Sequence, residues 1–371
     1  MNNNVIYFPG LNGLRAIAAL AVVVSHITIG LNSFGLNPYI IGSLDGGRPR
    51  GISLAGYGVS IFFVLSGFLI TYLLLAEKEN SPIVVKKFYL RRILRIWPLY
   101  YVYLLVAIIS SLAFGSIIDL KALIFYVFFA ANVPFIMGST LPLLSHYWSL
   151  GVEEQFYLIW PWLCKKVNSI IIPLVVITLT IITLKVGLHL FYPNSILELI
   201  ISVTRFHCMM IGAIGAILFR ERNSFFLNLL NNKLAQVLAW LTIVLLAVNK
   251  FHVASIIDNE LVSVVALVLI IGQIEVENRI VNLEVKIMDF LGKISYGIYV
   301  IHPLLIFFLS KILIGIKLSP FYKYPLVYLM VVGLTIFSSF LSYKYIERYF
   351  LSYKKKFEVV KSASTSQQRT N

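Results

Sequence analysis

The chain has 371 residues, of which 59% are hydrophobic and only 13% are charged, whereas soluble domains use about 25% charged residues. This composition excludes an ordinary soluble enzyme and indicates a protein whose solvent is the lipid bilayer. The formal net charge of +15 does not indicate a nucleic-acid partner, because Lys and Arg lie in short segments between apolar runs, as the positive-inside rule describes.

Apolar runs follow one another along the whole chain, and each is a candidate for a membrane-spanning helix of about 20 residues. Their residues do not alternate between apolar and polar, as the strands of a membrane β-barrel would. We therefore predict an all-α fold, a polytopic integral membrane helical bundle. The runs cover residues 12–31, 54–76, 97–115, 121–137, 146–164, 170–187, 199–219, 234–249, 253–273, 288–312 and 323–343.

The run at 121–137 is the weakest candidate for a crossing. Asp119 and Lys121 stand at its start, and Asn132 and Pro134 lie near its end. If every run crossed, basic segments would fall on both sides of the membrane, so we expect this run to be a re-entrant or interfacial segment. About ten crossings then remain, with both termini and most of the Lys and Arg residues in the cytosol.

The end of the chain, residues 351–371, is polar and low in complexity. Such a composition cannot bury enough apolar surface to fold, so we predict a disordered cytosolic tail there. Residues 1–350 then form one membrane-embedded domain. We expect neither a cleavable signal peptide nor an appended soluble domain, and no metal site.

Arg15 and His26 are ionisable residues within the first run. A charge inside a span costs at least a few kcal/mol, so each such residue is a candidate for function. The two residues are about three turns apart, so they project from nearly the same helical face and are separated by roughly 16 Å along the axis. Arg15 then lies at the cytosolic edge and His26 in the outer half. The alternative is a snorkelling arginine and a histidine that bonds to a neighbouring carbonyl.

Glu153 and Glu154 are the acidic residues that lie well inside a span. They are about 10 Å below the outer end of their helix, which is the expected depth of His26 and Arg205, with His302 nearer the middle. Adjacent helical residues point about 100° apart, so only one glutamate is expected to face a given partner. The alternative is an ion pair with Arg205 that only holds helices together.

The cytosolic segment at 86–98 carries the densest positive charge. Arg92 and Arg95 stand at i and i+3, so they share a helical face, and paired guanidinium groups suit phosphate oxygens. The alternative is charge that only sets the topology beside anionic lipid.

Four motifs occur in a fixed order along the chain. They are residues 11–15 (LNGLR) followed by His26, residues 58–70 (GVSIFFVLSGFLI), residues 91–98 (RRILRIWP) and residues 146–158 (HYWSLGVEEQFYL). With this ordered set the chain resembles the membrane-bound acyltransferase-3 family, which O-acylates bacterial surface polysaccharides, lipid-linked sugars and some small molecules. Weaker matches at residues 204–206 and 295–303 extend the resemblance to almost the whole chain.

The resemblance implies an acyl-CoA-dependent O-acyltransferase of the bacterial cytoplasmic (inner) membrane. The implied co-substrate is cytosolic acyl-CoA, commonly acetyl-CoA, and the implied acceptor is a carbohydrate hydroxyl, as in lipopolysaccharide, another surface polysaccharide or a lipid-linked precursor. The family's donor-binding arginine pair corresponds to Arg92 and Arg95, with Arg91 beside it. Its arginine and histidine for acyl transfer correspond to Arg15 and His26.

We expect His26 to act as general base or as a transient acyl carrier, because imidazole is the side chain that best suits proton transfer near neutrality. Glu153 or Glu154 would orient the imidazole. Direct attack and a relay both remain open, and a transporter lined by the same buried charges is the alternative function. The residues expected to bind the acceptor are Arg205, His302 and Trp148.

Overall fold

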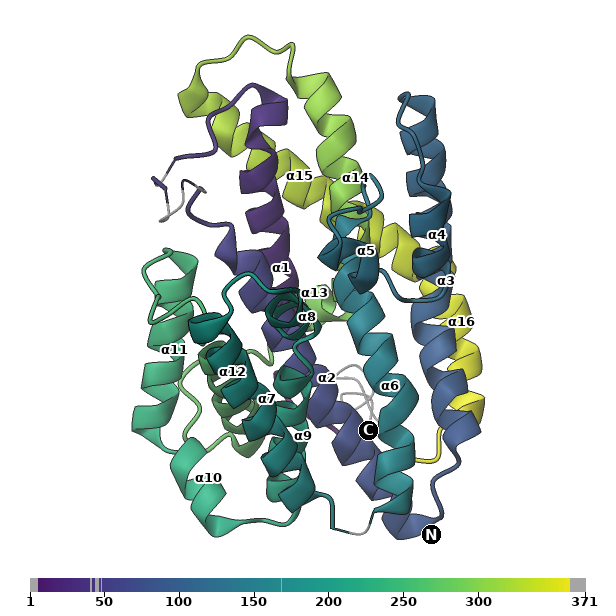
Figure 1. The fold of residues 1–371 in the computed structure, drawn as a ribbon, viewed down its shortest axis with the longest axis vertical. Coiled ribbons are helices and arrows are strands. Elements are labelled where there is room, and N and C mark those ends of the chain that lie inside the picture. Colours follow the sequence, from purple (N-terminus) through teal and green to yellow (C-terminus); the bar gives the residue numbers. More distant parts are fainter. Residues whose placement is uncertain (1–5, 41, 44–46, 48, 168, 361–371) are drawn as a thin grey trace.

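The computed structural model describes residues 6–360, except positions 41, 44–46, 48 and 168. Every regular element within these ranges is a helix, which confirms the predicted all-α fold. Many of the longer helices run roughly along the long axis of the molecule (Figure 1).

Helices α1, α2 and α9 form a trio in which α2 packs closely against both α1 and α9. Gly67 of α2 lies against the backbone of Met209 in α9, and Gly212 of α9 lies against the backbone of Val64 in α2, so neither glycine has room for a side chain. Small residues are typical of helix contacts in membranes, because close approach supplies the packing that holds helices together in lipid. The three helices span Leu11–Gly30, Ser53–Asn80 and Phe206–Arg220.

Other long helices surround this trio, and their outward faces expose many Leu, Ile, Val and Phe side chains, as a surface in contact with lipid does. Helices α3, α6, α7, α11, α12, α14 and α15 span Val85–Ala113, Trp148–Lys166, Ile171–Phe191, Lys233–Ala247, Asp258–Glu275, Ser295–Leu313 and Pro320–Ser342. The shorter helices α8, α10, α13 and α16 span Ile196–Thr204, Ser224–Leu230, Lys286–Lys293 and Arg348–Lys354.

The run at 121–137 forms two short helices, α4 (Leu120–Val127) and α5 (Asn132–Ile136). They are about 12 Å and 8 Å long at 1.5 Å per residue, too short to cross a hydrocarbon core of about 30 Å. The chain turns between them at Phe129, whose φ is 56°. This agrees with the prediction that the run does not cross the membrane.

Seven helical segments among the described residues are long and apolar enough to cross a membrane, or eight if the bent pair α10 and α11 is one span. Helices α6 and α12 have similar lengths but carry more charge: Glu153, Glu154, Lys165 and Lys166 in α6, and Asp258, Glu260 and Glu275 in α12. Length and composition therefore support a polytopic membrane protein without confirming the predicted number of about ten crossings.

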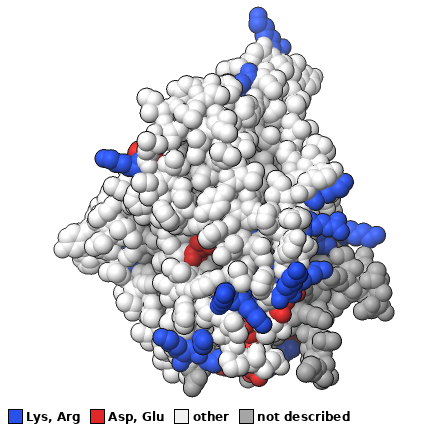
Figure 2. All heavy atoms as spheres, turned by 90° about the vertical axis from the view of Figure 1, so that its right-hand side faces the viewer, with Lys and Arg blue, Asp and Glu red and all other residues white. Residues whose placement is uncertain are grey.

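Charged side chains are unevenly distributed on the surface. In the face drawn in Figure 2, Lys and Arg gather over the lower part, and a broad zone above them carries few charges. The lower part is where α2 ends and α3 begins (Figure 1). A bilayer accommodates such a distribution, because an uncharged zone suits hydrocarbon and Lys or Arg suit the headgroup region.

The helical structure continues past residue 350, the predicted boundary of the membrane domain. Helix α15 passes through a π-helical turn (Tyr343–Glu347) into α16 and then a 3-10 turn (Lys355–Phe357). Helix α16 packs beside α3 (Figure 1), and the carbonyl of Phe357 accepts a hydrogen bond from Arg91 Nη1 at 2.9 Å. Residues 351–357 are therefore helical despite their polar composition, because packing of α16 on α3 stabilises them. Residues 361–371 of the predicted tail lie outside the described residues.

Candidate active site

Two cavities lie inside the bundle, one after the other along the axes of α1 and α2. The first, which we call the arginine cavity, has a volume of about 210 Å³ and is lined by Arg15, Arg92 and Arg95. The second, which we call the histidine cavity, has a volume of about 600 Å³ and is lined by His26 and His146. The N-terminal end of α1 and the middle of α2 line the arginine cavity, whereas the C-terminal half of α1 and the first two turns of α2 line the histidine cavity.

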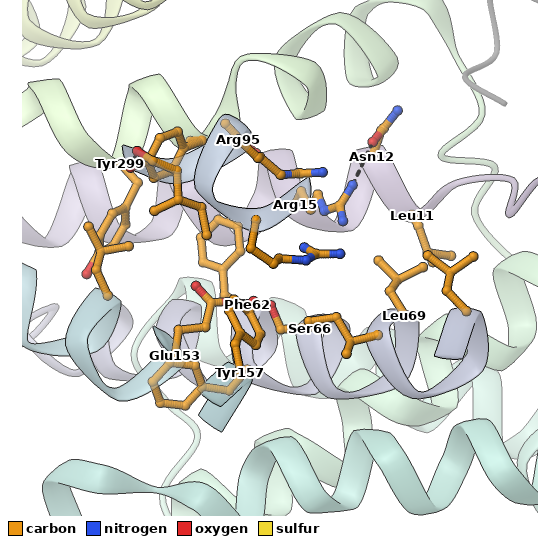
Figure 3. A pocket seen from close by; sticks show the side chains of 18 of the residues that line it. Leu11, Asn12, Arg15, Phe62, Ser66, Leu69, Arg95, Glu153, Tyr157 and Tyr299 are labelled. Carbon is orange, nitrogen blue, oxygen red and sulfur yellow. Dashed lines mark hydrogen bonds between the residues drawn. The ribbon is translucent and has the colours of Figure 1, made fainter. Parts of the chain in front are cut away.

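The arginine cavity is strongly positive. Arg15 comes from α1, whereas Arg92 and Arg95 come from one face of α3, and Figure 3 shows the side chains of Arg15 and Arg95 side by side. Lys354 of α16 adds a fourth cation, and Glu153 is the only acidic residue among the described residues that line the cavity. Such an excess of positive charge attracts anions, and guanidinium groups bind phosphate through two parallel hydrogen bonds.

A chain of hydrogen bonds holds Arg15 in place. Its Nη1 donates to Asn12 Oδ1 at 3.2 Å, and Asn12 Nδ2 donates to Asp289 Oδ1 of α13 at 2.8 Å. Asn12 precedes Arg15 by three residues, so both lie on one face of α1. The motif at 11–15 thus supplies both the arginine and the side chain that positions it.

Arg91 is directed differently from the other two arginines of its motif. It forms a salt bridge of 2.9 Å with Glu77 of α2, a side chain that is only 2% exposed. It lines a smaller neighbouring cavity of about 40 Å³ instead of the arginine cavity. The structure thus brings Arg92 and Arg95 together, as predicted, and gives Arg91 a partner within the protein.

The two adjacent glutamates have different surroundings. Glu153 lines the arginine cavity, where its carboxylate accepts hydrogen bonds from Ser66 Oγ and from Tyr157 OH, the latter at 2.6 Å (Figure 3). Glu154 is not among the residues that line either cavity. This separation follows from the 100° between successive residues of a helix.

The histidine cavity combines aromatic and polar side chains. Trp148 and Tyr57 line it, together with Arg205 and Asn259 and several serine residues. Aromatic faces beside a few hydrogen-bonding groups are typical of ligand-binding pockets, where the apolar walls supply affinity and the polar groups fix orientation. Two of the three residues predicted to bind the acceptor, Arg205 and Trp148, therefore line one cavity with His26.

His26 pairs with His302, and neither glutamate takes this position. The two rings are nearly parallel, with their centres 4.9 Å apart, and His26 Nδ1 lies 2.6 Å from His302 Nε2. His302 is fully buried, and its Nδ1 lies 3.2 Å from the carbonyl oxygen of Ile298. A carbonyl only accepts hydrogen bonds, so in neutral rings His302 donates through Nδ1 and accepts through Nε2, and His26 donates through Nδ1. The lone pair on His26 Nε2 is then left to accept a proton.

The expected contact between His26 and a glutamate is thus replaced by a contact between two histidines. His146 is the residue of that segment that reaches the level of His26, and its ring lies 5.4 Å from that of His302. Glu153 follows it by seven residues, about 10 Å further along the helix axis. The prediction placed the start of α6 correctly but set the glutamates too close to His26.

His146 was not among the predicted site residues. Its Nε2 lies 3.1 Å from the carbonyl oxygen of Val300 and therefore donates to it. Its Nδ1, which then accepts, is buried and has no hydrogen-bond partner among the described residues. The sequence feature that could have identified His146 is its position at the start of the motif at 146–158, two turns before Glu153.

Arg205 does not form the ion pair with Glu153 or Glu154 that the sequence left open as an alternative. Its Nη1 donates to the carbonyl of Gly56 and to Asn259 Oδ1, both at 3.0 Å, and its guanidinium lies 5.4 Å from the centre of the Trp148 ring. Arg205 has a φ of 45° at the break between α8 and α9. A non-glycine residue in this conformation is strained and often marks a functional position.

Val59 and Tyr299 line both cavities and so form their common wall. The hydroxyl of Tyr299 donates to the carbonyl of His146 at 2.8 Å and lies 2.5 Å from Ser149 Oγ. The wall is therefore fixed to the segment that carries His146. Within the described residues, no group of three or more His, Cys, Asp or Glu side chains is arranged to hold a metal ion.

Comparisons with known proteins agree on the kind of chemistry. The acyltransferase domain family matches residues 8–344. The peptidoglycan O-acetyltransferase OatA of Listeria monocytogenes is 38% identical over 167 residues, which is 42% of this chain and 24% of that protein. A putative O-acetyltransferase of Staphylococcus aureus is 29% identical over 378 residues, 92% of this chain and 57% of the relative.

Another relative, the O-acetyltransferase OatA of Staphylococcus aureus, is 29% identical over 230 residues, 57% of this chain and 35% of that protein. The alignments thus span about a quarter to just over half the length of these relatives. No solved structure matches the chain.

Proposed function

Because the chain belongs to the membrane-bound acyltransferase-3 family, we propose that it transfers an acyl group from acyl-CoA to a hydroxyl of a carbohydrate acceptor. The observation that carries this proposal is the pair of adjoining cavities, one lined by Arg15, Arg92 and Arg95 and the other by His26 and His146. Acetyl is the proposed acyl group, because the relatives are named O-acetyltransferases.

The arginine cavity is the proposed donor site. Arg92 and Arg95 bind the phosphates of the donor, as their shared face and excess charge favour. The thioester arm extends along α1 from Arg15 toward His26, a distance of roughly 16 Å at 1.5 Å per residue. Glu153, held by Ser66 and Tyr157, lies beside this path and positions the arm rather than the imidazole.

The histidine cavity is the proposed acceptor site. Trp148 offers an aromatic face to a sugar ring, while Arg205 and Asn259 offer hydrogen bonds to its hydroxyl groups. One relative is named for peptidoglycan, which supports a carbohydrate of the cell surface or its lipid-linked precursor.

The proposed chemistry begins when His26 Nε2 takes the proton of the acceptor hydroxyl. The resulting oxygen attacks the thioester carbonyl carbon, the bond from that carbon to sulfur breaks, and the proton passes from His26 to the departing thiolate. His302 positions the His26 ring during these steps, because it occupies Nδ1. The products are an ester of the acceptor and free coenzyme A.

The proposed location is the bacterial cytoplasmic membrane, with the arginine cavity toward the cytosol and both termini on that side. The gathering of Lys and Arg at the end of the bundle where α2 ends and α3 begins (Figures 1 and 2) supports this orientation, because cytoplasmic segments carry an excess of these residues.

The test is an assay of acetyl transfer in membranes with acetyl-CoA labelled in the acetyl group. His26→Ala and Arg92→Ala are compared with the wild-type protein at equal abundance. We expect His26→Ala to lower turnover at least about a hundredfold, as loss of a general base does, and Arg92→Ala to raise the KM for acetyl-CoA. Wild-type activity in both variants would overturn the proposal, and so would movement of the sugar across vesicles without any donor.

A further inference from the structure

Lys354 lies beside the proposed donor site although it belongs to the predicted tail. Its side chain lines the arginine cavity with Arg92 and Arg95, and it also lines the smaller neighbouring cavity. It is only 20% exposed, and its ion pair with Glu358 is long, at 3.8 Å. Lys354 thus remains available to a ligand in the cavity.

An irregular helical turn precedes α16, the helix that carries Lys354. The π-helical turn Tyr343–Glu347 separates α15 from α16, so α16 does not present the same face as α15. The buried Glu347 accepts a hydrogen bond of 3.2 Å from Ser342 Oγ within this region. Turns of this kind are rare and occur frequently at functional sites. Helix α16 then packs on α3, which carries Arg92 and Arg95.

The charges explain why such an arrangement needs a ligand. Lys354 and three arginines surround one cavity, and the carboxylate of Glu153 already accepts hydrogen bonds from Ser66 and Tyr157. Like charges brought together in a low-dielectric interior repel each other strongly. A polyanion in the cavity would relieve this repulsion and give each cation a partner.

We propose that Lys354 binds a phosphate group of the acyl-CoA donor, so that the C-terminal segment 343–357 is part of the donor site. This inference rests on the proposed function. Lys354 would be a ligand-binding residue that lies outside the family motifs. The donor would then be a polyanion whose phosphates contact both α3 and α16.

The experiment compares Lys354→Gln with Lys356→Gln in the full-length protein reconstituted in lipid nanodiscs. Lys356 is the matched control, because it lies two residues away and lines neither of the two cavities that Lys354 lines. The donors are acetyl-CoA and S-acetyl-pantetheine, which keeps the thioester arm but has no phosphate. KM and kcat are measured for both donors, and binding of coenzyme A is measured directly.

We expect Lys354→Gln to raise the KM for acetyl-CoA and the Kd for coenzyme A about tenfold, as loss of one charge-assisted hydrogen bond does. The kcat and the KM for S-acetyl-pantetheine should not change, Lys354→Arg should restore affinity, and Lys356→Gln should match the wild type. Equal loss with both donors, or wild-type affinity in Lys354→Gln, would overturn the inference alone. A wild-type protein that does not bind coenzyme A would overturn the proposed donor together with the inference.

Discussion

Nδ1 of His26 lies 2.6 Å from Nε2 of His302, and the opposite nitrogen of His302 is 3.2 Å from the carbonyl of Ile298. Because the carbonyl only accepts, this row of three groups fixes which nitrogen of each neutral ring carries the proton. The arrangement has the same logic as a carboxylate that holds a catalytic histidine in one tautomer. In its neutral form the buried His302 makes the corresponding contact without placing a charge next to His26.

We therefore predict that His302→Ala lowers kcat by at least about tenfold without changing the KM for acetyl-CoA, because the His26 ring loses the group that fixes its tautomer. His302→Gln should retain more activity, since an amide oxygen can accept the hydrogen bond from His26 Nδ1. Steady-state kinetics of both variants in nanodiscs measure the effect. If the two substitutions have the same effect on kcat, His302 acts only by filling space.

Glu153 and Glu154 provide a second test, because only Glu153 lines a cavity. We predict that Glu153→Gln lowers kcat/KM for acetyl-CoA about tenfold or more, since the hydrogen bonds that Ser66 and Tyr157 donate to Oε1 are weaker when the acceptor carries no charge, so the side chain is held less firmly. Glu154→Gln should remain within about threefold of the wild type. The assay is acetyl transfer at several donor concentrations. The reverse order of effects would contradict the placement of the two side chains.

Substitutions of Arg91 and Arg95 should have different effects, because Arg91 has a structural role and Arg95 is proposed to bind the donor. We predict that Arg91→Ala lowers the Tm, because it leaves the buried carboxylate of Glu77 without its ion-pair partner, and breaking a buried pair costs about 3–5 kcal/mol. Its KM for acetyl-CoA should change far less than that of Arg95→Ala. Thermal unfolding of the detergent-solubilised protein measures the first effect, and adding Glu77→Gln to Arg91→Ala should recover part of the lost Tm.

Arg95→Ala should behave in the opposite way. The KM for acetyl-CoA rises about tenfold or more, because a guanidinium bound to phosphate is lost, whereas the Tm stays close to that of the wild type. Kinetics and thermal unfolding are measured on the same preparations. A lower Tm with an unchanged KM would show that Arg95 supports the fold and does not bind the donor.

Sequence reasoning was most successful where spacing on a single helix decides the geometry. The distance from Arg15 to His26 along α1 places them in different cavities, and the i, i+3 spacing of Arg92 and Arg95 places both in one. The all-α fold and the division of the run at 121–137 into two short helices also follow from local composition.

Contacts between helices far apart in the sequence could not be predicted in the same way. The pairing of His26 with His302 depends on how α1 packs on α14, and no local pattern encodes that choice. Lys354 was missed because its polar neighbours suggested a disordered tail, whereas its position depends on the packing of α16 on α3. The depth of Glu153 in the membrane was predicted from the helix rise alone. The structure places His146, not Glu153, at the level of His26.

The wall between the cavities provides the last prediction. Val59 lines both cavities and is only 4% exposed, so a larger side chain there must project into the space between the donor and the acceptor. We predict that Val59→Trp lowers acetyl transfer at least about tenfold while coenzyme A binds as in the wild type, because a misplaced reacting group costs rate without costing affinity.

Val102→Trp is the matched control, because Val102 is 42% exposed on the outer face of α3 and does not line either cavity. It should leave both transfer and binding unchanged. If Val59→Trp retained full transfer, the acyl group would not pass between the two cavities at this wall. The reaction would then be assigned to the arginine cavity, where Glu153 is the only carboxylate among the described lining residues.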